Sequence, residues 1–511
     1  RSGTISSNLV RSLYLDDNDI LWIATTQGGI NMYNPNRRKF RDYFPYINDA
    51  EDPDLHFVKS IYEDHSGKIW IGTDDGLLKY SPELKLLDKY LHDPANRQGI
   101  PQGGITGIVE DSLNRLWISN WGGGLSLFDR EKDDFIHFKF DEENFDPEKM
   151  PGSNAILCLE KDYKGNLWMG TGNGYLEKFN PYEKQFRPYF LFDEDSLRGI
   201  PVVGITAEAN GTIWAAANPK GGVFRISNTG NISRYSFKNA EEKGLTTNEV
   251  YSVEIDQTGK LWLGTDVGLF VYQRKKDRFE KISGDENLPD MPVFNIIADV
   301  QNSLWLSTPF NLIKYDESDS SVVIYDDSDG VRTASTTGII THDNRIYLGG
   351  VNGITRFHPE NIAYNDDVPP VVLTDFLIRN ELVDIHTPGS PLTKALDVVD
   401  TIILDYDQSY FSFQFAALNY TQPERNRYAY KLEGFDDSWN YVETRRKAYY
   451  TNVPPGKYIF NVIGSNNNGI WNRDGASVLV IIKPPWYKTI WAYILYAGIF
   501  MVQGIMFLFI C

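Results

Sequence analysis

The chain has 511 residues and a formal net charge of −19, from 50 Lys and Arg against 69 Asp and Glu. This balance gives no overall positive field for phosphate backbones and argues against nucleic acid as a partner. Aromatic residues make up 14% of the chain and 42 residues are glycine. Long Ala-, Leu-, Glu- and Lys-rich stretches are scarce, so the composition predicts an all-β fold joined by glycine turns.

The first 357 residues contain eight copies of one sequence unit, such as VKSIYEDHSGKIWIGTDDGLLKY at 58–80. A period of 40 to 50 residues is typical of β-propellers. Each unit carries an aromatic residue at the same place, and we call these the marker aromatics: Trp22, Trp70, Trp117, Trp168, Trp214, Trp262, Trp305 and Tyr347. A residue that recurs in every unit serves the architecture. We therefore expect these rings to pack between blades instead of contacting a ligand.

Each unit is expected to form a four-stranded antiparallel sheet. In the second unit Val58, Ser60 and Tyr62 alternate as an inner strand does, and a turn at 64–67 ends in a glycine that supplies a positive φ. A second strand at 69–73 follows at once, and two more strands complete the sheet. Such a sheet cannot cover both of its apolar faces, so neighbouring sheets stack around an axis and close into a ring.

Eight units leave two arrangements open. Eight blades could close one ring with a strand borrowed from the N-terminus. Alternatively, the first unit belongs to an upstream propeller, and the other seven units form the ring.

Residues 366–485 show a different β pattern. Short β-like runs are separated by Gly, Pro and Asn clusters, at 371–377, 401–406, 410–415, 428–432, 458–463 and 478–482. This spacing is typical of an immunoglobulin-like sandwich. Four tyrosines are expected to bury their rings in it and to bond their hydroxyls to the backbone: Tyr428, Tyr430, Tyr450 and Tyr458.

The last 23 residues, 489–511, contain no charged side chain. At 1.5 Å rise per residue this length crosses a hydrocarbon core, so the segment predicts a transmembrane helix and a membrane association. Trp486, Tyr487, Lys488 and Trp491 gather at its start, as side chains do at a headgroup interface. The alternative is a buried C-terminal helix.

The repeats resemble the regulator propeller repeats of hybrid two-component system sensors. The segments SYFSFQFAALNYTQPERNRYAYKLEGFDDSW (409–439) and AYYTNVPPGKYIFNVIGSNNNGIW (448–471) resemble the triple-tyrosine domain that precedes the transmembrane helix in that family. The resemblance implies an extracytoplasmic sensor region that binds an oligosaccharide, forms a homodimer and signals to a histidine kinase encoded beyond Cys511. It places residues 1–485 in the periplasm of a bacterial inner-membrane protein.

The family's two rings of seven blades favour the arrangement with an upstream propeller. The resulting domain prediction has four parts. Residues 1–50 are a first repeat that is the last blade of an upstream propeller. Residues 51–365 form the propeller, 366–485 the triple-tyrosine domain and 489–511 the transmembrane helix.

Catalytic motifs are scarce in this chain. The seven histidines form no H-x-x-x-H or H-x-H pair, and the two cysteines, Cys158 and Cys511, lie far apart. Neither a metal site nor a disulfide framework is supported, and no cofactor is expected. Paired glycosidase acids leave no sequence signature, because their separation is a three-dimensional quantity. A propeller glycan lyase or hydrolase therefore stays as one alternative function, and a non-catalytic adhesion module is another.

The ligand site is expected on one face of the propeller. The loops between second and third strands share this face with the loops that enter the inner strands, and loops that depart from the consensus are the best candidates. Three repeats depart, at Asn120-Trp121, Asn218-Pro219-Lys220 and Pro309-Phe310-Asn311. Trp121 can stack on a pyranose ring, the amides can bond hydroxyls, and Lys220 can meet a uronate or sulfate. The predicted ligand-binding residues are Asn120, Trp121, Asn218, Lys220, Asn311, His56 and Arg332. The alternative is ordinary loop variation.

Overall fold

The structure of the chain is a computed structural model. It describes residues 5–510 except 17–18, 35–38, 44–56, 97, 192–198, 283–287, 289, 332–334, 352, 363, 388 and 489, and not the side chains of 41–43 and 504–510. The chain divides into two compact units, one of residues 38–362 and the other of residues 1–37 together with 363–511.

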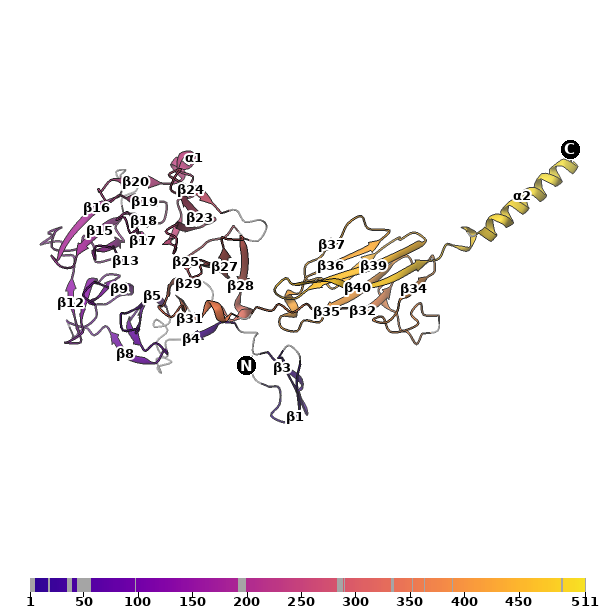
Figure 1. Cartoon of the computed structure of the whole chain (residues 1–511), viewed down its shortest axis with the longest axis horizontal. Helices are drawn as coiled ribbons and strands as arrows, with labels where there is room; N and C mark the ends of the chain where they lie inside the picture. The colour runs from indigo at the N-terminus through magenta and orange to yellow at the C-terminus, as the bar shows by residue number, and fades with distance from the viewer. Residues whose placement is uncertain are drawn as a thin grey trace. The chain divides into compact units, whose positions relative to one another are not determined.

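The described residues of the larger unit form seven four-stranded sheets, which we number blades 1 to 7 (Figure 1). Blade 1 is β5 (Val58–Glu63), β6 (Ile69–Thr73), β7 (Gly76–Tyr80) and β8 (Leu86–Leu91). Blade 2 is β9 (Ile105–Glu110), β10 (Leu116–Asn120), β11 (Gly124–Asp129) and β12 (Asp134–Phe138). Blade 3 is β13 (Ile156–Lys161), β14 (Leu167–Thr171), β15 (Tyr175–Asn180) and β16 (Gln185–Phe190). Blade 4 is β17 (Val202–Ala207), β18 (Ile213–Ala217), β19 (Gly222–Ile226) and β20 (Ile232–Tyr235).

The remaining blades follow the same order. Blade 5 is β21 (Val250–Ile255), β22 (Leu261–Thr265), β23 (Gly268–Gln273) and β24 (Arg278–Lys281). Blade 6 is β25 (Asn295–Ala298), β26 (Leu304–Ser307), β27 (Leu312–Asp316) and β28 (Ser321–Tyr325). Blade 7 is β29 (Ser335–Ile340), β30 (Ile346–Gly350) and β31 (Gly353–Phe357), completed by β4 (Arg41–Tyr43). Short helices lie beside the blades: η3 (Phe237–Asn239), α1 (Ala240–Lys243), η4 (Asp327–Asp329) and η5 (Pro359–Asn361).

The strand β4 closes the ring. It pairs antiparallel with β31, although the two strands come from opposite ends of the propeller sequence. The inner strand β29 of blade 7 also contacts β5 of blade 1, so each inner strand has an inner strand on both sides. Phe40, just before β4, is 2% exposed and its ring meets Tyr325 of blade 6 and Phe357 of blade 7 at 5.1 and 4.9 Å. The two ends of the propeller sequence are thereby held together.

The marker aromatics of blades 1 to 7 are buried, at 0 to 5% exposure, as predicted from their repetition. Each of the six tryptophans also donates its indole N–H to a carboxylate six residues earlier, at 2.7 to 3.0 Å. This acid begins the turn between the first and second strands, and in blade 1 its oxygens accept hydrogen bonds from Ser66 and Lys68 as well. The same carboxylate therefore fixes the turn and the ring.

The first repeat forms a three-stranded sheet, β1 (Val10–Leu15), β2 (Leu21–Thr25) and β3 (Gly29–Tyr33). Residues 41–43, which fall within the segment 1–50 predicted as the first repeat, form β4 and pair with blade 7 instead. Several apolar side chains of the three-stranded sheet are exposed: Leu13, Tyr14, Leu15, Ile30 and Tyr33.

The C-terminal strands form two packed sheets. One has the order β33 (Glu381–Leu382), β32 (Val371–Ile378), β35 (Phe411–Ala417) and β38 (Lys447–Tyr450). The other has the order β34 (Thr401–Leu404), β40 (Trp471–Ile482), β39 (Gly456–Ser465), β36 (Tyr428–Glu433) and β37 (Asn440–Tyr441). A short helix, η6 (Pro423–Arg425), precedes β36. Apolar side chains of both sheets share one core, which confirms the predicted immunoglobulin-like arrangement.

The four predicted tyrosines are buried in this core. The Tyr458 hydroxyl donates to the carbonyl oxygen of Pro454 (2.9 Å), and the Tyr428 hydroxyl accepts from the Ala417 N–H (3.1 Å). Tyr450 differs from the expectation because its hydroxyl donates to a side chain, the Asp436 carboxylate, at 2.9 Å.

The chain ends in η7 (Trp486–Lys488) and the helix α2 (Ile490–Ile510). The transmembrane helix predicted at 489–511 is not found: over the part of the chain that the structure describes, no helix combines the length and the apolar character that a bilayer span needs.

Candidate functional site

The predicted site residues lie on one face of the propeller, which we call the loop face. It consists of the loops between second and third strands and the loops that lead into the inner strands. Backbone hydrogen bonds join the two kinds of loop, for example from Trp121 to Gly104 and from Gly122 to Asn154. The candidates belong to blade 2 (Asn120 and Trp121), blade 4 (Asn218 and Lys220) and blade 6 (Asn311). They therefore share the loop face but are not adjacent. Blade 3 separates the residues of blade 2 from those of blade 4, and blade 5 separates those of blade 4 from Asn311 in blade 6. His56 and Arg332 lie outside the described residues.

Asn120 and Trp121 follow directly on one another and have opposite environments. Asn120 is fully buried, and its Nδ2 donates to the carbonyl oxygens of Gly103 (2.8 Å) and Pro101 (3.3 Å). Its Oδ1 accepts no hydrogen bond within the described structure. Trp121 is 52% exposed, and an exposed indole offers a flat apolar surface with one donor. Asn120 thus holds the loop that presents the Trp121 ring.

The other two loops present different groups. The Asn218 Nδ2 donates to the Val250 carbonyl oxygen at 3.1 Å, which ties its loop to the next inner strand. Lys220 is exposed and forms no ion pair with a described residue. In blade 6 the backbone N–H of Asn311 donates to Thr308 Oγ1 at 2.9 Å, and the preceding Phe310 is 73% exposed. Phe310 repeats the pattern of Trp121, an aromatic ring in the loop turn, and was not among the predicted site residues.

A pocket of about 440 Å³ lies beside Trp121 in blade 2. The segment that leads into β9 forms one wall, and the turn after Trp121 together with the end of β12 forms the other. Its lining is rich in polar groups: His92, Asp93, Pro94, Asn96, Gly99, Ile100, Pro101, Gln102, Gly122, Gly123, His137 and Lys139. We call it the blade 2 pocket.

Two histidines in the blade 2 pocket are held by neighbours. The ring Nδ1 of His92 donates to the Ile100 carbonyl oxygen at 3.0 Å. The ring Nδ1 of His137 is 2.9 Å from Ser126 Oγ, and the ring stacks on Phe135. Lys139 is exposed, without an ion pair to any described residue. Sequence reasoning missed these residues, because two loops and a strand from different parts of the repeat bring them together. The length of the 92–104 segment was the only local signal.

Two carboxyl groups on inner strands, those of Glu160 and Glu254, have raised pKa values. Burial, followed by the charge of Glu160, raises the pKa of Glu254 to about 8. Burial also raises the pKa of Glu160 to about 7, although Lys161 acts against it. Glu160 is on the inner strand β13 of blade 3 and Glu254 on the inner strand β21 of blade 5. No group of three or more metal-ligating side chains occurs among the residues described.

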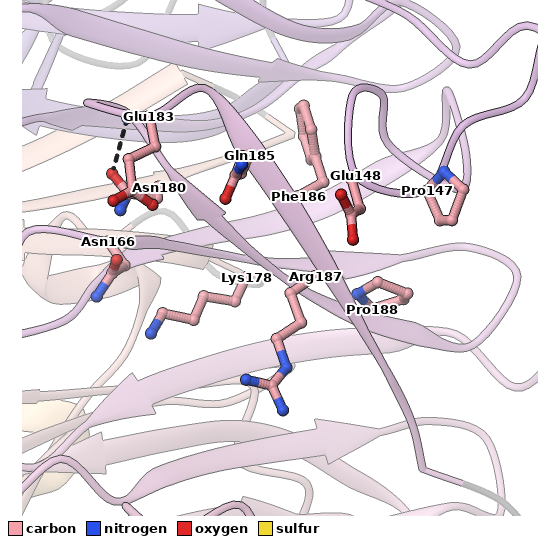
Figure 2. Close-up of a pocket in the computed structure, with 10 residues that line it drawn as sticks. All are labelled: Pro147, Glu148, Asn166, Lys178, Asn180, Glu183, Gln185, Phe186, Arg187 and Pro188. Carbon is pink, nitrogen blue, oxygen red and sulfur yellow. Dashed lines mark hydrogen bonds between the residues drawn. The ribbon is translucent and has the colours of Figure 1, made fainter.

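A second pocket, of about 520 Å³, lies at the outer edge of blade 3 (Figure 2). Side chains of β15 and β16 line it together with the end of the segment that enters the blade. The lining residues are Pro147, Glu148, Asn166, Lys178, Asn180, Glu183, Gln185, Phe186, Arg187 and Pro188. We call it the blade 3 pocket.

Comparison with protein families matches both parts of the chain. The model described as "Two component regulator propeller" matches residues 4–27, 53–75, 151–173 and 244–267. The model described as "Y_Y_Y domain" matches residues 419–483. The chain resembles the sensor region of hybrid two-component receptors.

A curated relative and two solved structures agree with this resemblance. A protein named Histidine kinase P4 from Formosa agariphila is 26% identical over 514 residues, which cover 97% of this chain and 33% of the relative. Two structures of an extracellular domain from B. thetaiotaomicron match with TM-scores of 0.54 and 0.55 and 22% and 21% identity. They are described as a putative one component and a putative hybrid two component system, and each match covers 95% of this chain and 64% of that domain.

The chain thus spans a third of the length of the curated relative. The solved structures support the fold: a propeller followed by a sandwich. The predicted resemblance to two-component sensors is confirmed.

Proposed function

We propose that this chain is the extracytoplasmic sensing region of a hybrid two-component receptor and that it binds an oligosaccharide on the loop face of the propeller. The observation that supports this most directly is the half-exposed Trp121, which directly precedes Gly122 in the lining of the blade 2 pocket. Sugars present apolar ring faces and many hydroxyls. The exposed indole of Trp121 offers a flat apolar surface, and the pocket that begins at the following Gly122 offers the polar groups of His92, Gln102 and Lys139.

The volume of the blade 2 pocket suits one sugar unit of an oligosaccharide. The adjoining sugar units would then extend over the loop face. Pockets of 300 to 1,000 Å³ are the usual size for small ligands. Asn120 contributes by holding the loop, since its Nδ2 is engaged by the backbone of the segment that leads into β9. Lys220 and Phe310 lie on the same face in blades 4 and 6, where a longer ligand would meet them.

Calorimetric titration of the chain against plant, host and microbial oligosaccharides tests this proposal. We expect one glycan class to bind wild type, and Trp121→Ala to weaken that binding at least tenfold with an unchanged melting temperature. Tyr406→Ala is the matched control, because Tyr406 is 48% exposed in the segment after β34 of the C-terminal sandwich and lines neither pocket. Equal loss in both variants, or no loss in either, would place the ligand elsewhere. Turnover of a bound glycan would support a lyase or hydrolase instead.

We further propose that seven is the full number of blades in the ring, and that a blade of a preceding propeller covers the exposed apolar side chains of β1 to β3. In this proposal the receptor is a homodimer of the bacterial inner membrane with residues 1–485 in the periplasm. Ligand binding changes the spacing or rotation of the two C-terminal helices in the dimer. A kinase that follows residue 511 responds to this change, and transcription is regulated as a result.

Crosslinking tests the dimer proposal. Tyr487 is 43% exposed in η7, and Tyr487→Cys is placed in a chain that also carries Cys511→Ser. Burial raises the pKa of the Cys158 thiol to about 12, so it stays unreactive at neutral pH. A saturating glycan is expected to change the crosslinking yield. An unchanged yield with a glycan that does activate transcription would contradict the proposal.

A further inference from the structure

Two cationic side chains, Lys178 and Arg187, line the blade 3 pocket. Lys178 on β15 lies directly opposite Arg187 on β16 in the antiparallel register. Like charges placed directly opposite each other in a sheet are destabilising. Within the described structure neither side chain forms an ion pair. Two positive charges therefore occupy opposite positions without an ion pair to any described acid, in a chain whose net charge is −19.

Blade 1 has an acid at the position that corresponds to Arg187. There Lys79 occupies the place of Lys178, opposite the marker aromatic Trp70 as Lys178 is opposite Trp168. Both ammonium groups lie over the indole ring, at 5.2 and 5.8 Å. The residue opposite Lys79 is Asp88, and the two form an ion pair at 2.7 Å. Blade 3 keeps the lysine of this arrangement and has an arginine where blade 1 has the acid.

The arginine is positioned by an aromatic ring. The Arg187 guanidinium lies 5.4 Å from the centre of the Tyr189 ring, and such a contact stabilises a cation without neutralising it. Figure 2 shows the Lys178 and Arg187 side chains in the lower part of the pocket. A lysine and an arginine at opposite positions of one sheet face, both lining one pocket, are suited to an oxyanion, because the fork of Arg takes two oxygens and Lys supplies a further charge.

The rest of the lining suits a polar organic ligand. Gln185 is exposed beside Arg187, and its amide is without a hydrogen-bond partner among the residues described. The side chain of Pro188 adds apolar surface. Two acids, Glu148 and Glu183, also line the pocket, and in Figure 2 they lie above the two cations. The two acids can accept hydrogen bonds from the ligand's hydroxyl groups. They would repel an anionic group, so the anionic end of the ligand is directed toward the two cations.

We infer that the blade 3 pocket binds an acidic sugar, with a carboxylate or sulfate ester held between Lys178 and Arg187 and the hydroxyls toward Gln185 and the two acids. The inference deepens the proposed function, since it names an acidic saccharide as the ligand class, but it concerns a site on a different blade from Trp121.

Binding of small probes to the whole chain tests the inference. Glucuronate and glucose 6-sulfate supply the two kinds of anion, glucose is the neutral probe, and inorganic sulfate is the anion without a sugar. We expect one or both acidic sugars to bind at least tenfold more tightly than glucose and than inorganic sulfate, with affinity falling as salt rises. Equal binding of inorganic sulfate and the acidic sugars, or of glucose and the acidic sugars, would overturn the inference.

Arg187→Asp is the decisive variant, because it gives Lys178 the partner that Lys79 has in blade 1. We expect it to fold with unchanged or higher stability and to lose at least tenfold in affinity for the acidic sugar. Lys132→Asp is the control, since it makes the same charge change at an exposed turn of blade 2. An unchanged affinity in Arg187→Asp, or an equal loss in Lys132→Asp, would contradict the inference. Trp121→Ala separates the two proposals, because it should leave the binding of these single sugars unaltered.

Discussion

The indole N–H of each marker tryptophan in blades 1 to 6 bonds a carboxylate that also organises a turn. In blade 3, Trp168 is 5% exposed, donates to Asp162 Oδ2 at 3.0 Å and lies against Tyr189. Blade 7 supports the link between the two residues, because the marker aromatic there is Tyr347 and the turn residue six positions earlier is Thr341. Where the indole is absent, the acid is absent too.

Replacing Trp168 therefore tests both contributions. We expect Trp168→Ala to lower the free energy of unfolding by about 3–5 kcal/mol, because it removes a large buried ring. Trp168→Phe keeps most of the apolar volume and loses the hydrogen bond, so a smaller loss of about 1 kcal/mol is expected. Chemical denaturation of the two variants measures both values. Equal losses in the two variants, or none, would mean that the ring does not pack between blades as described.

The two inner-strand acids predict a dependence of stability on pH. Because burial raises the pKa of Glu254 from 4.5 to about 8, its neutral form is favoured in the folded chain. Its contribution to stability is complete below about pH 4.5 and is lost as the pH rises toward 8. Glu254→Gln should remove this loss, with a gain on the order of 1–3 kcal/mol at pH 9 and little difference at pH 4. Thermal unfolding at both pH values, with the exposed Glu131→Gln as control, measures it. Parallel profiles of Glu254→Gln and wild type would refute the assignment.

At the scale of elements, the segment 364–370 is attached to the sandwich by amides. Asn466 is fully buried and its Nδ2 donates to the carbonyl oxygens of Asn365 and Asp367, both at 2.8 Å. Its Oδ1 accepts from the N–H groups of Asn468 and Ile470. A single side chain thus satisfies four backbone groups, which joins the β39–β40 turn to the segment that follows the propeller.

Removing this amide should loosen the segment without unfolding the sandwich. Asn466→Ala leaves four backbone groups without partners, and each buried polar group left unpaired costs about 1–3 kcal/mol. We expect faster hydrogen exchange and faster proteolysis at 364–370, measured against Asn440→Ala, an exposed asparagine of β37. Protection equal to wild type at 364–370 would show that the amide is not what holds it.

At the scale of the whole molecule, ring closure depends on residues that precede the first blade. Phe40 fills the space between blades 6 and 7, and β4 pairs with the edge of β31. Closure matters because an unpaired edge strand exposes its backbone groups, and a ring removes that edge.

Phe40→Ala is therefore expected to destabilise the propeller by about 3–5 kcal/mol although it lies outside the repeat it stabilises. Thermal unfolding followed by intrinsic fluorescence measures this change. The matched variant is Phe237→Ala, at a ring that is 64% exposed in η3, and it should be nearly neutral. Equal melting temperatures for Phe40→Ala and wild type would show that β4 is not required for closure.

The amino-acid sequence alone determined the repeat, the four-strand unit, the burial of the marker aromatics and the sandwich, because these follow from local alternation, turn residues and periodicity. It also indicated Trp121, since Asn120-Trp121 replaces the Thr-Asp or Thr-Gly pair of other repeats. The partner of β4, the meeting of Lys178 with Arg187 and the shifted acidities of Glu160 and Glu254 were decided only by the tertiary structure. The partner of β4 and the acidity of Glu254 depend on strands of different blades becoming neighbours in the ring, which residues far apart in the chain set. The Lys178–Arg187 pair depends instead on the register of the β15–β16 hairpin within blade 3.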